Sequence, residues 1–146
     1  MKRYYPHLLV ALQFGTIFTM ILYAAADFSF SLSGLVLLLA GIAVGLWAIA
    51  LHPKDNFNIR PELKEACCLV THGLYRYIRH PMYTSVMLMQ LGVVLFRPSL
   101  AAWTMWAFLV LVLYLKAHRE EKLWMKHDAA YTAYKKRTRY FIPYIF

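Results

Sequence analysis

Long apolar runs limit what this 146-residue chain can fold into more than any other feature of its sequence. One run extends from about His7 to Ala26 and a second from about Ser33 to His52. Each is long enough to cross the hydrocarbon core of a bilayer, which takes about 20 helical residues. Hydrophobic residues make up 61% of the chain, whereas roughly half of an average soluble domain is apolar. The sequence therefore predicts an all-α, multi-pass integral membrane protein.

A third apolar run, Met82 to Lys116, is too long for one span and is interrupted by Arg97, Pro98 and Ser99. Arginine is costly in hydrocarbon and proline removes a backbone donor, so the interruption is expected at a turn near a membrane interface. We predict a helical hairpin, which gives a bundle of about four transmembrane helices. Its first arm, Met82 to Phe96, reaches only about 23 Å, so it is short for a bilayer or thins the bilayer locally.

The basic residues indicate how the chain is oriented in the membrane. The net charge is +9, and of the sixteen Lys and Arg residues two precede the first run, five lie between Pro53 and Tyr83, and eight follow from Lys116 onward. Only Arg97 falls at the opposite end. Because basic residues are enriched in cytoplasmic loops, both termini and the central loop are predicted to be cytoplasmic. We assign the charge to this topology and to membrane lipid headgroups, and expect no nucleic-acid partner.

The same pattern divides one domain, residues 1–146, into four parts. We expect two N-terminal spans in residues 1–52 and a cytoplasmic loop with a polar motif in residues 53–83. The hairpin is expected in residues 84–116 and a cytoplasmic C-terminal segment in residues 117–146. The first span ends in Ala24–Ala26 like a signal peptide, and we expect it to be retained as a helix. In the second span, Gly34, Gly41 and Gly45 are spaced for close contact with another helix.

The two predicted cytoplasmic segments have different local patterns. Proline, asparagine and glycine make the loop irregular, with a β-like lead-in over Cys68–Gly73. From Lys116 onward the pattern is that of an amphipathic helix, in which Tyr131 and Tyr134 lie one turn apart and which Pro143 ends. We expect this helix to lie on the cytoplasmic face or to bend back over the bundle.

The most polar stretch of the loop reads GLYRYIRHPMY, from Gly73 to Tyr83. Pro81 suits the first turn of the following helix, where the backbone donors are spare. Arg76, Arg79 and His80 are interpreted either as interfacial anchors beside an aromatic belt or as part of a functional site. The motif alone leaves both interpretations open.

A second polar cluster, Arg119, Glu120 and Glu121, follows the hairpin. It fits a solvated helix end, but the chain has only seven acidic residues, and carboxylates at the end of a span that face the bundle are functional candidates. Because the hairpin goes out and returns, this cluster and His80 are expected at the same membrane level. We therefore predict a site of guanidinium, imidazole and carboxylate groups that binds a polar cofactor beside an apolar substrate.

These pieces occur in a recognisable order. GLYRYIRHPMY, then REEKL after the hairpin, then Tyr131 and Tyr134, then Arg139 to Pro143, resembles the superfamily of isoprenylcysteine carboxyl methyltransferases and phospholipid methyltransferases. The resemblance covers roughly Leu69 to Pro143, about half of the chain. Enzymes of this superfamily lie in membranes and use S-adenosylmethionine. The resemblance thus implies methyl transfer to a prenyl, phospholipid or other lipophilic acceptor, and we infer no obligate protein partner.

The resemblance also implies where the cofactor binds. The pocket would contain no Rossmann sheet and would be built from the loop, the inner face of the hairpin and the C-terminal helix. The residues expected to bind the cofactor are Gly73, Tyr75, His80, Pro81, Tyr83, Glu120, Glu121, Tyr131 and Tyr134. The residues expected at catalytic positions are Arg76, Arg79, His80 and Arg139. No ligand spacing such as H-x-x-x-H occurs, and no metal is expected.

Two other functions remain open on the sequence alone. Sterol reductases, which are membrane enzymes that use NADPH, have a similar hairpin and motif but are longer chains. A non-catalytic lipid-binding subunit would use the polar clusters only as interfacial anchors. In a methyltransferase, an arginine would orient a carboxylate acceptor, whereas an amine acceptor would give its proton to a base such as His80.

Overall fold

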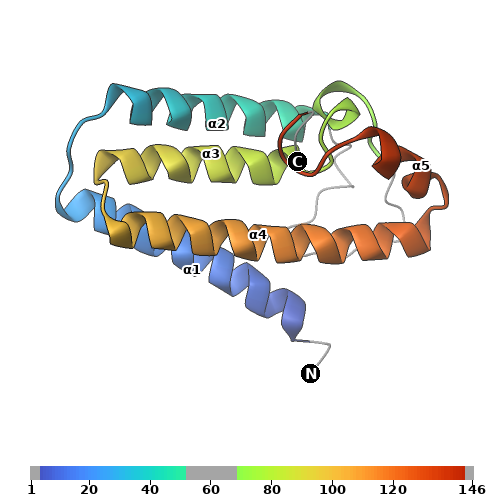
Figure 1. The fold of residues 1–146 in the computed structure, drawn as a ribbon, viewed down its shortest axis with the longest axis horizontal. Coiled ribbons are helices and arrows are strands. Elements are labelled where there is room, and N and C mark those ends of the chain that lie inside the picture. Colours follow the sequence, from blue (N-terminus) through green and yellow to red (C-terminus); the bar gives the residue numbers. More distant parts are fainter. Residues whose placement is uncertain (1–3, 52–68, 144–146) are drawn as a thin grey trace.

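A computed structural model describes residues 4–51 and 69–143, which form an α-helical bundle with one short 3-10 turn (Figure 1). The elements are α1 (Tyr5–Ala26), α2 (Leu32–Ala50), the 3-10 turn η2 (Gly73–Arg76), α3 (Pro81–Phe96), α4 (Leu100–His127) and α5 (Ala130–Arg137). Within the described ranges, β-type pairing is limited to an isolated bridge between Ile78 and Arg139. The predicted all-α class is confirmed.

The four long helices run alternately between the two ends of the bundle (Figure 1). α2 packs most closely on α3, and α1 crosses obliquely against α4. As a result η2, the start of α3, the end of α4 and α5 gather at one end, at the right in Figure 1, which we call the α5 end. The predicted hairpin is confirmed, because Arg97–Ser99 joins α3 to the antiparallel α4.

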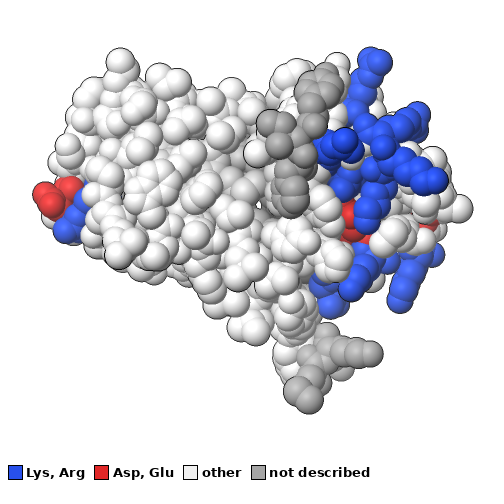
Figure 2. All heavy atoms as spheres, in the orientation of Figure 1, with Lys and Arg blue, Asp and Glu red and all other residues white. Residues whose placement is uncertain are grey.

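The helices have the lengths and surfaces of membrane spans. α1, α2 and α4 are each long and apolar enough to cross a membrane. α3, with 16 residues, reaches about 24 Å at about 1.5 Å per residue and is the short arm expected of the hairpin. Lys and Arg gather at the α5 end in Figure 2, and the face between the two ends carries no charge. The chain is an integral membrane protein.

Glycines let α2 and α3 approach each other closely. A Cβ atom on Gly41 would lie 2.7 Å from Met89 N and 2.9 Å from Ser85 O, and one on Gly34 would lie 2.9 Å from Gly92 O. Ser85 Oγ also donates a hydrogen bond to Gly41 O at 2.7 Å. The predicted close helix contact is confirmed, and its partner is α3. Such packing stabilises a membrane bundle because lipid provides no hydrophobic drive between helices.

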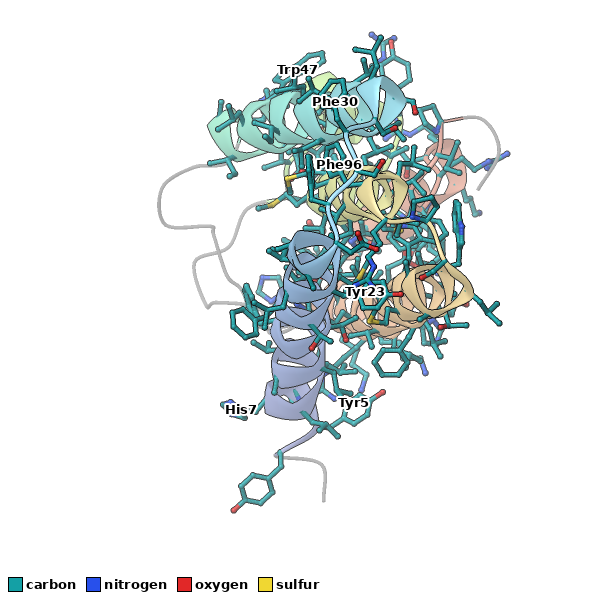
Figure 3. The ribbon with its side chains drawn as sticks, turned by 90° about the vertical axis from the view of Figure 1, so that its left-hand side faces the viewer. Tyr5, His7, Tyr23, Phe30, Trp47 and Phe96 are labelled. Carbon is teal, nitrogen blue, oxygen red and sulfur yellow. The ribbon has the colours of Figure 1, made fainter. Side chains whose placement is uncertain are left out.

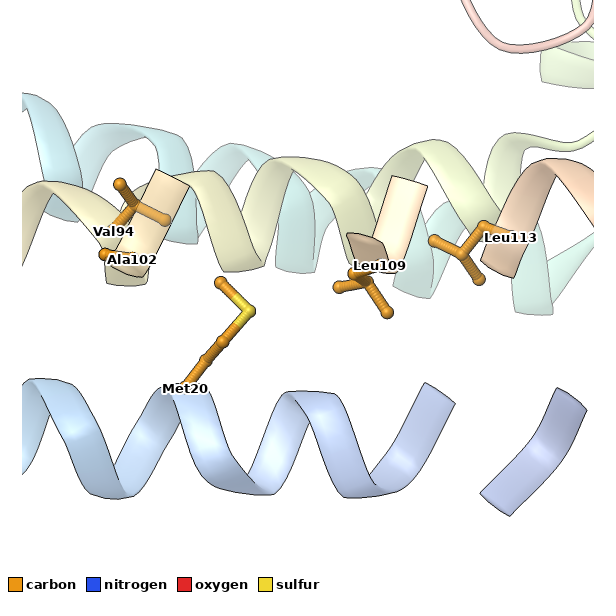
Figure 4. Packing of buried hydrophobic residues seen from close by; sticks show 5 residues of the cluster. All are labelled: Met20, Val94, Ala102, Leu109 and Leu113. Atoms are coloured by element: carbon orange, nitrogen blue, oxygen red, sulfur yellow. The ribbon is translucent and has the colours of Figure 1, made fainter. Parts of the chain in front are cut away.

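An apolar core shared by α1, α3 and α4 lies against the other face of α3 (Figure 4). Its buried members are Met20, Val94, Ala102, Leu109 and Leu113. Leu109 and Leu113 lie one turn apart on α4 and are both 0% exposed. This core holds α1 against the length of α4 that leads to the α5 end.

Arg97 fastens the two turns at the far end of the bundle. Its Nη1 donates a hydrogen bond to Tyr23 O at 2.8 Å, and its guanidinium carbon lies 4.1 Å from the centroid of the Tyr23 ring. The Tyr23 hydroxyl lies 2.9 Å from Ser99 Oγ, and Arg97 Nε lies 3.6 Å from Asp27 Oδ2. Figure 3 views the bundle from this end. The predicted turn at Arg97 is confirmed, and its place near a membrane interface stays a prediction.

The C-terminal segment differs from its prediction. The prediction of a single helix from Lys116 to Pro143 is wrong, because α4 ends at His127 and a separate helix, α5, ends at Arg137. Asp128 breaks the helix because its Oδ1 accepts a hydrogen bond from Ala130 N at 2.8 Å and so starts a new turn. After α5 the backbone is extended, because its peptide groups bond to the polar motif instead of continuing a helix. The chain thus bends back over the α5 end.

Much of the predicted cytoplasmic loop lies outside the described residues, which resume at residue 69. Of the predicted β-like lead-in Cys68–Gly73, residues 69–72 are described and form no strand, and Gly73 already belongs to η2. The extended pairing occurs later, between Ile78 and Arg139, because the returning C-terminal segment supplies the partner there.

Candidate functional site

The polar motif begins with a turn that only glycine accommodates easily. Gly73 has a φ of +59°, which other residues rarely adopt, and a Cβ atom there would lie 2.5 Å from Leu51 Cδ1. The following turn buries Tyr75, whose carbonyl oxygen accepts a hydrogen bond from the Tyr134 hydroxyl at 2.7 Å. The start of the motif is therefore tied both to the end of α2 and to α5.

Arg79 and His80 connect this turn to α3. Pro81 is the first residue of α3, as predicted. The backbone N–H of Arg79 donates to Arg139 O at 2.8 Å, and that of His80 donates to Tyr140 O at 3.2 Å. The C-terminal segment therefore lies directly along the motif.

The imidazole of His80 lies between the two carboxylates of α4. His80 Nδ1 is 3.5 Å from Glu120 Oε2, and His80 Nε2 is 3.5 Å from Glu121 Oε1. Burial acts to lower the pKa of His80, but the polar contacts with both glutamates and their negative charges outweigh it and raise this pKa above its usual value. The hairpin thus brings the two clusters together at one level.

Glu121 is a buried carboxylate held by two cations. Its Oε1 lies 2.5 Å from Arg79 Nε, and its Oε2 lies 2.8 Å from Lys135 Nζ. Arg79 Nη1 also donates to the carbonyl oxygens of Thr138 and, at 3.2 Å, of Lys135. The family resemblance implies a catalytic position for Arg79. In the structure its guanidinium contacts Glu121 of α4 and the carbonyl oxygens of Lys135 and Thr138.

Glu120 is more accessible and has different neighbours. The Tyr83 hydroxyl donates a hydrogen bond to Glu120 Oε1, and the Glu120 side chain is 19% exposed. Beneath this pair lies Lys116, whose Nζ is 5.2 Å from the centroid of the Tyr83 ring and donates a hydrogen bond to Gln13 Oε1 at 2.5 Å. A polar chain thus runs from α1 through Lys116 and Tyr83 to Glu120.

Aromatic rings surround the imidazole. Tyr83 stacks on His80 at 5.5 Å between ring centroids, and Tyr140 lies at 5.8 Å. The Phe141 ring lies at 5.9 Å, and the Arg79 guanidinium carbon is 4.5 Å from the centroid of the Tyr140 ring. Aromatic faces of this kind attract cations.

The remaining predicted residues lie around this centre. Tyr131 and Tyr134 are buried on α5, where Tyr131 stacks on Trp124 at 5.9 Å and links α5 to α4. Arg76 and Arg139 are exposed at the α5 end. Of the three predicted arginines, Arg79 alone is buried in the cluster.

Two buried atoms of the site, His80 Nε2 and Glu121 Oε2, have no hydrogen bond among the described residues, although Glu121 Oε2 forms an ion pair with Lys135. His80 Nε2 has no hydrogen bond there, since its 3.5 Å separation from Glu121 Oε1 exceeds ordinary hydrogen-bond lengths. Native structures rarely leave a buried polar atom unpaired. His80 Nε2 is therefore a candidate contact for a polar ligand group.

An apolar groove of about 600 Å³ lies between α3 and α4 beside the polar cluster. Its walls include Met87, Leu88, Leu91, Trp106, Val110 and Tyr114. At its head, Thr84 Oγ1 lies 3.3 Å from His80 O and donates to Phe141 O at 2.9 Å. Leu111 and Ile142 line it too and are about half exposed, so the groove opens to the exterior. The polar and apolar parts of the predicted site are thus adjacent.

Sequence reasoning missed five residues of the cluster, namely Gln13, Lys116, Lys135, Thr138 and Tyr140. Gln13 and Lys116 carry a usable signal, because polar side chains inside membrane spans are rare and face the bundle. The other three owe their places to the bend at Asp128, which turns α5 and the segment after it back over the site and which the sequence pattern does not reveal. Among residues 4–51 and 69–143, no group of three or more His, Cys, Asp or Glu side chains could hold a metal ion.

Comparison with known proteins identifies the family. A model of the phospholipid methyltransferase family matches residues 29–132, which include the polar motif, the hairpin and both glutamates. A comparison with curated proteins gives no significant match. The family belongs to the same superfamily as the isoprenylcysteine carboxyl methyltransferases, as the sequence resemblance implies. The chain belongs to the phospholipid methyltransferase family, whose members are membrane methyltransferases that act on lipid-like substrates.

Proposed function

We propose that this chain transfers a methyl group from S-adenosylmethionine to a lipophilic acceptor at the membrane interface. The observation that carries the proposal is the position of His80, which lies 3.5 Å from each of two carboxylates and whose carbonyl contacts Thr84 at the head of an apolar groove. A polar, partly cationic cofactor and an apolar acceptor can therefore meet at one point.

The residues around His80 suit S-adenosylmethionine. Glu120 and Glu121 provide carboxylate oxygens for amino and hydroxyl groups, and the rings of Tyr83 and Tyr140 favour a cationic centre. The buried, unpaired Nε2 of His80 provides a further polar partner. The full set that we propose to bind the cofactor is Gly73, Tyr75, His80, Pro81, Tyr83, Glu120, Glu121, Tyr131 and Tyr134.

Methyl transfer requires mainly that the protein align the methyl donor with the acceptor. When bound, S-adenosylmethionine would supply an electrophilic methyl group on a sulfonium. In-line attack by the acceptor would form the new bond to this carbon as the carbon–sulfur bond breaks and S-adenosylhomocysteine leaves. The protein's part is to orient both reactants and to keep water out, an effect that can contribute several kcal/mol. If the acceptor is an amine, we propose that His80 in its neutral form takes its proton. If the acceptor is a carboxylate, an arginine is needed to orient it.

The three arginines then have two kinds of role. Arg79 is engaged by Glu121 and by backbone carbonyls, so we propose that it holds Glu121 in position at the catalytic end of the site. Arg76 and Arg139 are exposed beside the site. We propose that these two bind the acceptor's headgroup where it meets the membrane surface.

The groove between α3 and α4 supports a lipophilic acceptor. Its volume of about 600 Å³ lies within the roughly 300–1,000 Å³ of small-molecule sites. The gathering of Lys and Arg at the α5 end supports a cytoplasmic location for the site and for both termini. The acceptor itself, whether prenyl, phospholipid or other, is left to experiment.

Calorimetric titration of the purified chain in detergent with S-adenosylhomocysteine tests the cofactor. The chain is expected to bind S-adenosylhomocysteine and not NADPH, and Glu120→Gln is expected to weaken binding about tenfold or more, as the loss of a hydrogen bond to a charged group does. Incubating membranes with labelled methyl donor then identifies the acceptor as the labelled lipid. Binding of NADPH alone would replace this proposal with a reductase, and binding of neither compound would favour a non-catalytic lipid-binding subunit.

A further inference from the structure

The candidate site includes a buried cation, Lys116, that lies within the apolar helix α4. Lys116 is 1% exposed and lies one turn before Glu120 on α4, so the two side chains share a helix face. An ammonium group inside a membrane bundle is costly, and such residues are usually kept for a function and face a polar partner. Its surroundings therefore indicate what it does.

Lys116 is held by a residue of α1. Its Nζ donates a hydrogen bond at 2.5 Å to Oε1 of Gln13, which is itself 6% exposed. α1 lies before the residues 29–132 that match the family. The helix outside the family match thus contributes a buried polar group that reaches the site.

On its other side Lys116 acts on Glu120. Its Nζ lies over the Tyr83 ring, the Tyr83 hydroxyl donates to Glu120, and the ammonium and the Glu120 carboxylate interact electrostatically. The second carboxylate, Glu121, contacts Arg79 and Lys135 instead. Glu120 faces His80, which carries a charge only when protonated, so Lys116 is a cation near Glu120 that does not depend on His80.

We propose that Lys116, held by Gln13 of α1, is a positioning residue that acts through Tyr83 to direct the Glu120 carboxylate at the cofactor position. This inference rests on the proposed function. Lys116 acts through Tyr83 and Glu120 and does not touch the reactants. Its contribution is greatest when His80 is neutral, because the imidazolium otherwise supplies a second positive charge beside Glu120.

The pH dependence follows from the groups that face this pair. These are Arg79 just before α3, Tyr83 in the first turn of α3, Glu121 on α4, Tyr131 and Lys135 on α5, Tyr75 in η2 and Tyr140 in the C-terminal segment. Arg79 and Lys135 are paired with Glu121. Burial and nearby negative charge raise the pKa of Tyr75, Tyr131 and Tyr140, so these remain neutral. Within this set, His80 is the group that changes its charge near neutral pH.

The test measures the affinity of the full chain for S-adenosylhomocysteine on both sides of the His80 titration. Lys116→Met, which keeps the length of the side chain without its charge, is expected to weaken binding about tenfold above the pKa of His80. Below that pKa the loss is expected to be clearly smaller. Gln13→Leu should give a similar but weaker pattern. The matched control on α1 is Thr16→Val, because the Thr16 hydroxyl donates to Leu12 O of its own helix at 2.7 Å, and this variant should leave binding unchanged.

A double-mutant cycle tests the coupling of Lys116 and Glu120 without relying on cofactor binding. Lys116→Met, Glu120→Gln and the double variant are compared by thermal unfolding. If Lys116 and Glu120 are coupled, the double change lowers the midpoint by less than the two single changes together. Additive changes overturn the inference, as does a loss of affinity in Lys116→Met that is equal at both pH values. Wild-type protein that binds no S-adenosylhomocysteine but gives a coupled cycle would contradict the cofactor proposal and leave the coupling established.

Discussion

Glu121 Oε1 on α4 lies 2.5 Å from Nε of Arg79, which stands just before α3, although the two residues are 42 positions apart in the sequence. Both side chains are nearly fully buried. A buried carboxylate is costly unless cations and hydrogen bonds compensate it, and here Lys135 provides the second cation. This ion pair locks α3, α4 and α5 together at the proposed site.

We predict that Glu121→Gln lowers the stability of the bundle by about 3–5 kcal/mol, since Arg79 is then left as a buried cation without its carboxylate. Unfolding in detergent, followed by circular dichroism, measures the loss. The double variant Arg79→Met/Glu121→Met is the control, and it should be more stable than Glu121→Gln. An unchanged midpoint in Glu121→Gln would show that the ion pair contributes little.

His80 gives the protein a defined pH dependence. Its pKa is raised in the folded protein, so its contribution to stability is fully present below the unfolded value of about 6.5 and is lost as the pH rises through the folded value. We expect the unfolding midpoint to fall over this interval and to fall less in His80→Gln. If the unfolding midpoint falls equally with pH in the wild type and in His80→Gln, the effect belongs to another histidine.

The close contact of α2 and α3 depends on the absence of a side chain at Gly41. Gly41→Ala places a methyl group 2.7 Å from Met89 N and 2.9 Å from Ser85 O, both of which are backbone atoms. We expect a loss of about 1–3 kcal/mol, as for other overpacked interiors. Gly15→Ala on α1 is the matched control, because a Cβ atom there meets nothing within 4 Å. Equal stability of the two variants would contradict the packing.

The apolar groove can be tested without touching the polar cluster. Ala107→Phe fills part of the groove, so we expect it to slow methyl transfer to a long-chain acceptor and to leave S-adenosylhomocysteine affinity unchanged. Ala101→Phe is the control, because Ala101 is exposed on the same helix away from the groove. Equal rates for both variants with a long-chain acceptor would place the acceptor elsewhere.

The site illustrates how far residue patterns reach. His80, Glu120 and Glu121 could be predicted to meet, because a hairpin returns to the level at which it starts and the two clusters flank it. Pro81 could be placed in the first turn of α3 by its missing backbone donor. Lys135 and Thr138 could not be placed, because their contacts with Glu121 and Arg79 depend on a bend in the chain after Asp128.

The sequence by itself determined the helical class, the spans, the turn at Arg97 and the family motif, because these depend on apolar length and on the local chemistry of proline, glycine and charge. Only the tertiary structure decided that Glu121 is held by Arg79 and Lys135, and that α1 contributes Gln13 to Lys116. Such contacts arise when separate helices pack together. Their geometry follows from side-chain fit across the bundle, which no local pattern of residues specifies.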